Sequence, residues 1–467
     1  MSTRSLWLQE ALAAEDGVES SELIEPIRAD VCIVGGGYTG LWTALRIAEL
    51  EPDASIALVE ADTCGGGPSG RNGGFALSWW PKVETLIKRT GEEEAMRLVR
   101  SSVAAVDELG AFCEREGIDA HFQRGGWLWT ATSPAQLGAW EGAVAAAARA
   151  GERPFEVLSA EEAQRRTGSP VHLGAAYEAG AATVQPALLA RGLRRVAVER
   201  GVRVFERSPL VELDRERGIV RTAAGSVEAG AIVLATGAWL AAIPELKRAV
   251  VAVSSDMVAT APMPERLEEA GWTGGESISN CRLMVHYYRT TSDGRIAFGQ
   301  GGHRHVFGGR VDDGFLGTTP EQAERILRRD LVRLVPYAEG VDVTHAWGGP
   351  IDRTADGAPI FGRLPGRVPI VYAVGYSGNG VAPSLTAGKI LASSALGRDD
   401  EWSGCGLNGG VTGKFPPEPV RYLGGFVVRR AIERKEAAED ASREPSRLDR
   451  RLAALAPGGV AAGARTR

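Results

Sequence analysis

The stretch Ala29–Glu60, ADVCIVGGGYTGLWTALRIAELEPDASIALVE, decides the fold. It opens with a short apolar run rich in β-branched residues, as buried parallel strands do. Helical periodicity follows over Leu41–Leu50, and Ser55–Glu60 forms a second apolar run. Strand, helix and strand together predict one βαβ unit of about the minimal size.

The turn between the first strand and the helix fits the pattern GxGxxG, from Gly35 to Gly40. Gly35 permits a tight turn, Gly37 lets the backbone approach a pyrophosphate, and Gly40 lets the helix pack closely on the strand. The start of that helix offers unpaired N–H groups to phosphates. Glu60 ends the second strand 20 residues after Gly40, where its carboxylate can accept hydrogen bonds from ribose hydroxyls. Because an acid there disfavours a 2′-phosphate, the stretch predicts NAD or FAD rather than NADP.

Composition describes an ordinary globular protein with one deviation. The 467 residues suggest two or three domains, and 44% are hydrophobic and 24% charged. A net charge of −6 and a pI near 5.8 argue against a nucleic-acid partner. Glycine is the deviation, because 60 residues exceed the usual share of about 7%. Many tight turns and close backbone approaches to a ligand explain that excess best.

Cysteine usage and hydropathy indicate the compartment. The five cysteines are dispersed without metal-binding spacing, which is typical of reduced thiols in a cytoplasmic protein and predicts no metal site. No run of about 18 apolar residues is present, and the N-terminus lacks the pattern of a secretory leader. We therefore expect a cytoplasmic protein with no membrane span.

A second glycine-rich loop follows the acid directly. Gly65–Gly70 also fits GxGxxG, but no strand precedes it and Pro68 interrupts it, so it does not predict a second dinucleotide fold. The loop continues as Ser69–Gly74, SGRNGG, which carries Ser, Arg and Asn donors. It could lie along a pyrophosphate and under a flavin, and the alternative is a mobile surface loop.

Two later turns complete the predicted nucleotide site. Ala235–Gly237 ends an apolar strand, and Gly375–Gly380, GYSGNG, lies between a strand and a helix. The start of that helix could place partial positive charge near the pyrimidine end of a flavin. The predicted cofactor contacts are Gly35, Gly37, Tyr38, Thr39, Gly40, Glu60, Ala61, Ser69, Gly70, Arg71, Asn72, Gly73, Gly74, Ala235, Thr236, Gly237, Trp239, Gly349, Gly375, Gly378, Asn379, Gly380 and Val381.

The order of strand signals predicts the architecture. Parallel-sheet signals occur near residues 29–60, 200–236 and 371–375, with hairpin signals between them such as the turn Thr291–Gly294. We expect an α/β chain, α+β overall, in which an antiparallel-sheet substrate domain is inserted into a Rossmann-like FAD-binding domain. The predicted FAD-binding domain comprises 1–118, 176–244 and 346–430, the substrate domain 119–175 and 245–345, and a charged, partly disordered tail 431–467.

Several motifs in order resemble one known family. The lead-in SLWLQEAL, the βαβ stretch, SGRNGGF, ATGAW, and WGGPIDRTADGAPIFG followed by VGYSGNGV resemble the FAD-dependent D-amino-acid oxidase superfamily. The nearest groups are the γ-glutamylputrescine oxidoreductase-like and glycine/sarcosine oxidase-like amine oxidases. The matches run from residue 6 to about residue 430. The resemblance implies an FAD domain with an antiparallel substrate sheet above the flavin.

The same resemblance implies a reaction. It is flavin-dependent oxidation of a small amine or amino acid, by hydride transfer from the Cα–H to flavin N5. The imine then hydrolyses to an aldehyde or oxo acid, and O2 reoxidises the flavin and gives H2O2. Two alternatives stay open, namely a dehydrogenase that passes electrons to a quinone or other carrier, and an NAD(P)H-dependent flavin monooxygenase. The oligomeric state is open as well.

The sequence departs from the family pattern at two places. Many relatives have His where this chain has Asn379, which puts in doubt any histidine-assisted step there. Gly348–Asp356 contains no cysteine and Cys64–Gly74 no histidine, so we expect non-covalent FAD. We expect Trp347, Tyr376 and Asn379, which lie in or beside the shared motifs, to be catalytic.

Aromatic and basic residues are the candidates for substrate contact. Tyr287–Tyr288 on the hairpin and the tryptophans could wall in an amine, although most aromatic residues of any domain are core. Arg282 and Arg289 could grip a carboxylate, with surface placement as the alternative. His303 and His305 have no partner that would suggest a metal. The predicted substrate contacts are Phe75, Trp80, Tyr288, Arg289 and Trp347.

Overall fold

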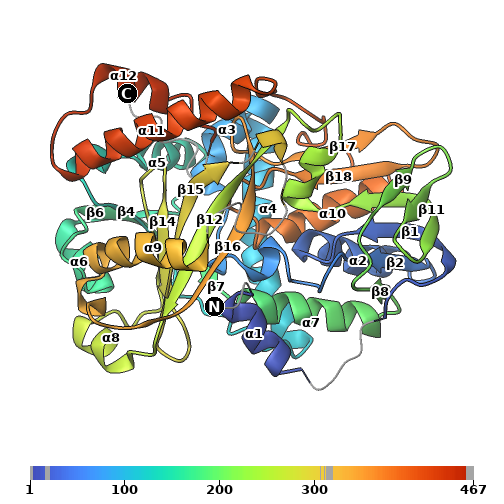
Figure 1. Ribbon diagram of the computed structural model, residues 1–467, viewed down its shortest axis with the longest axis horizontal. Helices are drawn as coiled ribbons and strands as arrows, with labels where there is room; N and C mark the ends of the chain where they lie inside the picture. Colours follow the sequence, from blue (N-terminus) through green and yellow to red (C-terminus); the bar gives the residue numbers. More distant parts are fainter. Residues whose placement is uncertain (1–3, 16–20, 306, 310, 312–318, 459–467) are drawn as a thin grey trace.

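Two large sheets form the molecule, one on each side of the ribbon view in Figure 1. The computed structural model describes residues 4–15, 21–305, 307–309, 311 and 319–458. The N-terminal helix lies between the two sheets at the lower edge of the view, and the last two helices lie over the second sheet. This mixed α/β architecture, with a Rossmann-like unit and a second sheet domain, confirms the predicted fold class.

The first sheet contains the predicted βαβ unit. β1 (Pro26–Val34) pairs in parallel with β2 (Ile56–Val59) on one side and with β11 (Ser226–Leu234) on the other. β18 (Ile370–Val374) continues the parallel pairing beside β11, so strands from three distant segments share one sheet. The remaining strands are β8 (Arg203–Phe205), β9 (Glu212–Asp214), β10 (Ile219–Arg221) and the antiparallel edge strand β17 (Ile360–Leu364).

Two helices cover one face of this sheet and touch each other. They are α2 (Tyr38–Leu50) and α10 (Pro383–Ala395). A Cβ at Gly388 would lie 2.8 Å from the Cβ of Trp42, so a glycine is needed for this close approach. Leu41 and Leu45 of α2 are fully buried against the strands. The contact fixes the starts of both helices at the same edge of the sheet.

The second sheet is predominantly antiparallel. Its strand order is β16-β12-β15-β14-β13-β4-β6-β5, and the β13–β4 pair is parallel. The predicted hairpin is present as β14 and β15 around Thr291–Gly294. The strand bounds are β4 Trp127–Ala131, β5 Glu156–Leu158, β6 Gly174–Glu178, β12 Val250–Thr260, β13 Ser277–Asn280, β14 His286–Thr290, β15 Ile296–His305 and β16 Val343–Thr354.

The other described elements surround the two sheets. The helices are α1 Leu6–Ala13, α3 Val83–Thr90, α4 Glu92–Arg115, α5 Glu141–Arg149, α6 Ala160–Thr167, α7 Pro186–Glu199, α8 Pro264–Ala270, α9 Pro320–Leu334, α11 Val420–Asp440 and α12 Arg447–Ala453. Short strands β3 (Phe75–Ala76) and β7 (Ala182–Thr183) pair with each other. The 3₁₀ turns are η1 Pro68–Gly70, η2 Trp80–Lys82, η3 Pro134–Gln136, η4 Gly237–Ala242, η5 Phe307–Gly309 and η6 Pro336–Ala338.

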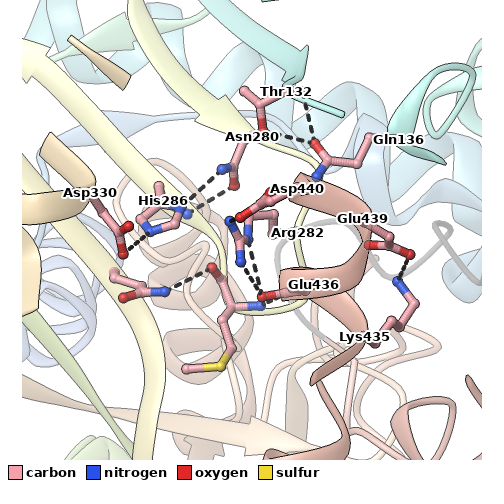
Figure 2. A network of polar contacts seen from close by, with 12 residues as sticks. Thr132, Gln136, Asn280, Arg282, His286, Asp330, Lys435, Glu436, Glu439 and Asp440 are labelled. Carbon is pink, nitrogen blue, oxygen red and sulfur yellow. Dashed lines mark hydrogen bonds and ion pairs between the residues drawn. The ribbon is translucent and has the colours of Figure 1, made fainter. Parts of the chain in front are cut away.

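The C-terminal helices dock on the second sheet, and this corrects the predicted start of the tail. Figure 2 shows Arg282, just after β13, between the carboxylates of Glu436 and Asp440 on α11, with N–O distances of 3.1 and 2.8 Å. Glu436 also accepts a hydrogen bond from the Met284 N–H. The boundary at residue 431 therefore falls inside one docked helix. Residues 459–467 lie outside the described part of the chain.

The other predicted domain boundaries remain proposals. The boundary at residue 176 lies within β6, and the boundary at residue 346 lies within β16. Moving both boundaries to the nearest strand ends keeps each sheet whole.

Among the described residues, no helix is both long and apolar enough to cross a bilayer.

Candidate active site

A cavity of about 640 Å³ connects the two sheets. One end lies at Glu60 and Pro209, beside the ends of β2 and β8, and the other end reaches Tyr287 and Gly301 on the second sheet. Between them it passes the starts of α2 and α10. A volume in this range suits a small-molecule or cofactor site, and the position beside the strand ends is typical of α/β dinucleotide-binding folds.

The first turn of α2 forms the nucleotide end of the cavity. Gly35 has a φ of +112°, and a Cβ at Gly37 would lie 2.8 Å from the Ser69 Oγ, so both positions depend on glycine. The N-cap residue of α2 is Gly37, which makes no side-chain cap hydrogen bond to the helix. Glu60 accepts a hydrogen bond of 2.7 Å from the Gly36 N–H, and burial raises the pKa of its carboxyl. The geometry matches a ribose-binding acid beside a phosphate-binding turn.

Four of the predicted glycines do not line the cavity, but each allows a close contact or a positive φ next to it. A Cβ at Gly40 would collide with the Gly35 carbonyl, and one at Gly70 with the Gly65 carbonyl. Gly74 and Gly375 have φ of +75° and +88° and face Val184 and Thr354. The cavity itself is lined by Gly35, Gly37, Tyr38, Thr39, Glu60, Ala61, Ser69, Arg71, Asn72, Gly73, Ala235, Thr236, Gly237, Trp239, Gly349, Gly378, Gly380 and Val381 from the predicted set.

The SGRNGG loop is held in place by hydrogen bonds rather than exposed as a mobile loop. The Ser69 Oγ accepts from the Tyr38 N–H at 2.9 Å, at the start of α2. The Arg71 guanidinium donates to the carbonyls of Gly66 and Gly348, which ties the loop to β16. The Asn72 side chain accepts from the Gly74 N–H and donates to Pro68 and Ser69 carbonyls. The loop thereby forms one wall of the cavity.

The turn Gly375–Gly380 forms another wall of the cavity, and buried polar groups hold this turn in place. The Tyr376 hydroxyl lies 2.7 Å from the Thr39 hydroxyl, joining the turn to the start of α2. Lys82 donates to the Tyr376 and Gly357 carbonyls, and burial lowers its pKa to about 7. Asp352 accepts from the Gly375 N–H at 2.6 Å, and burial raises its pKa to about 6. These groups hold the turn in the cavity wall.

Asn379 and Trp347 are not among the residues that line the cavity, and their catalytic roles stay predictions. Asn379 donates to the Ser78 carbonyl at 2.8 Å and is buried, because Ser377 and Gly378 take positive φ values and turn its side chain inward. The Trp347 indole N–H donates to the Arg71 carbonyl at 2.9 Å. Both residues position cavity-lining loops. Tyr376 alone of the three lines the cavity.

Four of the five predicted substrate contacts are not among the residues that line the cavity. Tyr288 packs with Trp272 and Phe298 on the opposite face of β14, because neighbouring residues of a strand alternate in direction. Trp80 is buried in the core under η2. Arg289 donates to the Val184 carbonyl at 2.6 Å and lies over the Trp7 ring. Trp347, also predicted here, lies behind the loop as described above.

Tyr287 takes the place predicted for Tyr288. It lines the cavity, its hydroxyl lies 2.7 Å from the Ser255 hydroxyl, and its ring meets Phe75 edge to face. Phe75 lines the cavity as predicted. Arg282 forms ion pairs with the two carboxylates of α11, so it is not available to bind a substrate carboxylate.

Sequence reasoning missed several polar groups of the lining, among them Ser255, Asp352 and Arg353. Proximity offers one signal for Asp352 and Arg353, since both follow the predicted contact Gly349 on β16 and all five residues from 349 to 353 line the cavity. Ser255 carries no such signal, because it becomes part of the lining only through its pairing with Gly301 on β15.

The lining fits FAD. Glu60 would hold the ribose, the start of α2 with Ser69 the pyrophosphate, and the SGRNGG loop with the Gly378–Val381 turn the flavin. Gly35 and Gly37 support this, because a Cβ at Gly35 would lie 2.6 Å from the Ala235 carbonyl oxygen and one at Gly37 would lie 2.8 Å from the Ser69 Oγ, so side chains there would displace the turn. The fold and cavity therefore define a dinucleotide-binding flavoprotein with a second sheet over the ligand.

Comparison with known proteins gives the family. Residues 30–394 match the family model DAO, FAD dependent oxidoreductase, so this chain belongs to that family and FAD is its cofactor. γ-Glutamylputrescine oxidoreductase of Escherichia coli is 31% identical over 379 residues, which cover 80% of this chain and 85% of the relative. A probable oxidoreductase, OrdL, of Haemophilus influenzae is 28% identical over 383 residues, covering 80% and 84%. The resemblance seen in the sequence motifs is confirmed.

A solved structure supports the fold independently. Glycine oxidase from Geobacillus kaustophilus superposes with a TM-score of 0.66 at 22% identity, covering 83% of this chain and all of that one. At this level of identity the likeness shows the shared fold.

Proposed function

We propose that this protein oxidises a small amine or amino acid with non-covalently bound FAD. The observation that carries the proposal is the single cavity that runs from Glu60 to the Tyr287 face of the second sheet. Its lining includes both the predicted nucleotide-binding turns and residues of the second sheet, which supports a cofactor at one end and a substrate at the other. The names of the relatives, a γ-glutamylputrescine oxidoreductase and glycine oxidases, favour amines and amino acids as the substrate class.

The proposed reaction balances without a catalytic acid–base pair. Bound FAD supplies the hydride acceptor. The substrate Cα–H leaves as hydride with two electrons, and the nitrogen lone pair forms a C=N bond. Water adds to that carbon and expels the nitrogen as ammonia or an amine, which leaves an aldehyde or oxo acid. O2 takes up the two electrons and two protons as H2O2.

The chain's own part is to orient the substrate and exclude water. Phe75, Leu77, Val285 and Ile351 give the substrate end of the cavity apolar walls, and Tyr287 adds an aromatic face. Desolvation in such walls lowers the pKa of an amine and favours the neutral form that loses hydride. Placement of the substrate over the cofactor then accounts for most of the rate.

Non-covalent binding and a cytoplasmic location are further parts of the proposal. Gly348–Asp356, where some relatives attach flavin, contains no cysteine. Cys32, Cys64, Cys113, Cys281 and Cys405 are all free thiols, which supports a reducing compartment.

Anaerobic bleaching of the bound flavin tests the proposal. A panel of primary amines, N-methyl amino acids and amino acids is mixed with the FAD-loaded protein, and the flavin absorbance is followed. We expect bleaching by at least one amine and none by NADPH. Bleaching by NADPH alone would contradict the proposal and indicate a monooxygenase.

A second measurement identifies the electron acceptor. Admitting air after bleaching should restore the flavin absorbance and release one H2O2 per flavin. Slow recovery in air with fast recovery on adding a quinone would assign a dehydrogenase instead.

A further inference from the structure

The connection between β13 and β14 forms part of the cavity wall. It comprises residues 281–285, and both Ser279 before it and Val285 at its end line the cavity. The Gly301 N–H donates to the Val285 carbonyl at 3.1 Å, which attaches the end of the connection to β15. Tyr287, two residues further on, also lines the cavity. A shift of residues 281–285 would therefore move the part of the lining that the second sheet contributes.

α11 holds this connection from the outside of the sheet through Glu436. One carboxylate oxygen of Glu436 accepts from the Met284 N–H at 3.1 Å, and the other pairs with Arg282 at 3.1 Å. Asp440, one turn further along α11, pairs with the same guanidinium at 2.8 Å (Figure 2). The Glu436 side chain is 3% exposed. Because both oxygens of this buried carboxylate bind the connection, each bond is charge-assisted and costly to lose.

Apolar contacts join the same segments. Met284 is buried in one cluster with Ile432 of α11 and Ala453 of α12, and Leu283 packs against this cluster. Both helices follow residue 394, where the match to the family model ends. A C-terminal part of this chain beyond the matched residues therefore fixes a segment of the cavity wall.

The two ends of the connection are fixed separately, inside the second sheet. The Asn280 side chain accepts from the His286 N–H at 3.0 Å, and the His286 Nε2 lies 3.2 Å from a carboxylate oxygen of Asp330 on α9. In the middle, the Gln300 side chain donates to the Met284 carbonyl over 3.4 Å. This bond is longer than those from α11, so the position of the middle depends most on α11.

We propose that Glu436 is a positioning residue, which sets the shape of the amine end of the cavity by fixing residues 281–285. The inference rests on the proposed function, because it takes the second-sheet end of the cavity as the amine site. Glu436 is not among the residues that line the cavity, so it acts through the connection. The connection is separate from the SGRNGG loop and the Gly375–Gly380 turn. Its displacement should therefore weaken amine binding and leave FAD in place.

Glu436→Gln tests the role of the carboxylate in the FAD-loaded protein. Glutamine has one oxygen where glutamate has two, so the Met284 N–H and Arg282 lose one of their two acceptors. We expect the KM of the best amine to rise about 3- to 10-fold, with kcat within about twofold and FAD content unchanged. Glu439→Gln is the matched control, since Glu439 is also buried on α11 but pairs with Lys435 of the same helix. An equal rise of KM in the control would overturn the proposal.

The reactivity of Cys281 reports the position of the connection without turnover. Cys281 is partly exposed, whereas the other four cysteines are buried. Burial raises the pKa of its thiol, so the wild type should react slowly with iodoacetamide. We expect several-fold faster alkylation of Cys281 in Glu436→Gln, located by peptide mass spectrometry, and no change in Glu439→Gln. Equal rates in Glu436→Gln and the wild type would overturn the proposal, as would faster alkylation with an unchanged KM.

The wild type offers a test that needs no variant at position 436 to fold. The Cys281 thiolate displaces sulfinate from methyl methanethiosulfonate and becomes a methyl disulfide, which inserts a small group beside the connection. We expect the KM of the amine to rise, to return after treatment with dithiothreitol, and to stay constant in Cys281→Ser. An unchanged KM after complete modification would overturn the proposal.

These readouts separate the two proposals. If no amine reduces the flavin, the proposed oxidation fails, whereas the alkylation rates still decide whether Glu436 holds residues 281–285. If an amine reduces the flavin and its KM is the same in the wild type and Glu436→Gln, the oxidation stands and the positioning role of Glu436 is overturned.

Discussion

The indole rings of Trp7 and Trp347 meet edge to face with centroids 5.8 Å apart, and both hold the same loop. The Trp7 N–H donates to the Asn72 carbonyl at 3.0 Å, and the Trp347 N–H donates to the Arg71 carbonyl at 2.9 Å. Trp7 lies on α1, before the residues that match the family model, and Trp347 lies on the second sheet. The SGRNGG loop is therefore positioned from two distant parts of the chain.

Removing either indole N–H should weaken cofactor binding. Trp7→Phe and Trp347→Phe each keep an aromatic ring but leave one loop carbonyl without its donor. We expect the FAD dissociation constant to rise about 5- to 10-fold in each, consistent with roughly 1 kcal/mol per hydrogen bond. Fluorescence titration of the apoprotein with FAD measures this. Because the rings touch, the double variant should differ from the sum of the two, and unchanged affinity in both single variants would contradict the role of the pair.

The glycine at the start of α2 should tolerate no side chain. In Gly40→Ala the new Cβ would collide with the Gly35 carbonyl, so helix and strand must separate. We expect a loss of about 1–3 kcal/mol in the free energy of unfolding and reduced FAD content. Gly180→Ala is the matched control, since a Cβ there meets nothing within 4 Å. Equal thermal stability of the two variants would argue against the close packing described.

The two neighbouring tyrosines of β14 should respond differently to the same substitution. Tyr287→Phe removes a hydroxyl from the cavity wall together with its bond to Ser255, so we expect the KM of the best amine to change several-fold and stability to fall by about 1 kcal/mol. Tyr288→Phe removes the bond to His172 in the core, so we expect about 1 kcal/mol lower stability and an unchanged KM. Steady-state kinetics and denaturant unfolding of both variants test which tyrosine faces the cavity. A changed KM in Tyr288→Phe with an unchanged KM in Tyr287→Phe would refute this assignment.

The buried carboxyl of Glu178 should contribute a decrease in stability as the pH rises. Burial raises the pKa of Glu178 to about 7, whereas an exposed glutamate titrates near 4.5. Between these values the folded protein keeps a proton that the unfolded chain releases, so the free energy of unfolding falls as pH rises and levels off above about pH 7. The largest slope from this group is about 1.4 kcal/mol per pH unit.

Glu178→Gln should remove that component. We expect a flatter stability profile from pH 5 to pH 8 and a variant more stable than the wild type at pH 8. Urea unfolding at several pH values checks this, with the exposed Glu161→Gln as control. A profile for Glu178→Gln that parallels the wild type would show that another group causes the pH dependence.

Local signals were sufficient for the nucleotide-binding unit. The strand, GxGxxG turn, helix and acid of Ala29–Glu60 are contiguous, so periodicity and spacing predicted β1, α2 and β2 directly. The short helix at Leu6–Ala13 and the hairpin around Thr291–Gly294 were also predictable, because each depends on neighbouring residues.

Side-chain direction was harder to predict. Tyr287 and Tyr288 are the same residue type in adjacent positions, and only the pairing register of β14 shows which one faces the cavity. Asn379 follows two residues with positive φ, a backbone conformation that propensity does not predict for Ser377. Its inward direction therefore required the structure.

Long-range contacts explain the remaining differences between the sequence-based predictions and the structure. The sequence around Glu436 is highly charged and predicted a charged, partly disordered tail, but Arg282 pairs with Glu436 from 154 positions earlier in the chain.

The transfer of hydrogen from substrate carbon to flavin is the central claim, and stopped-flow flavin reduction tests it most directly. The FAD-loaded protein is mixed anaerobically with a saturating concentration of the best amine, in protiated form and with deuterium at the reacting carbon. We predict that the flavin is fully reduced in a single turnover and that the deuterated amine reduces it several-fold more slowly. Failure of every amine to reduce the flavin, or reduction only by NADPH, would contradict the claim.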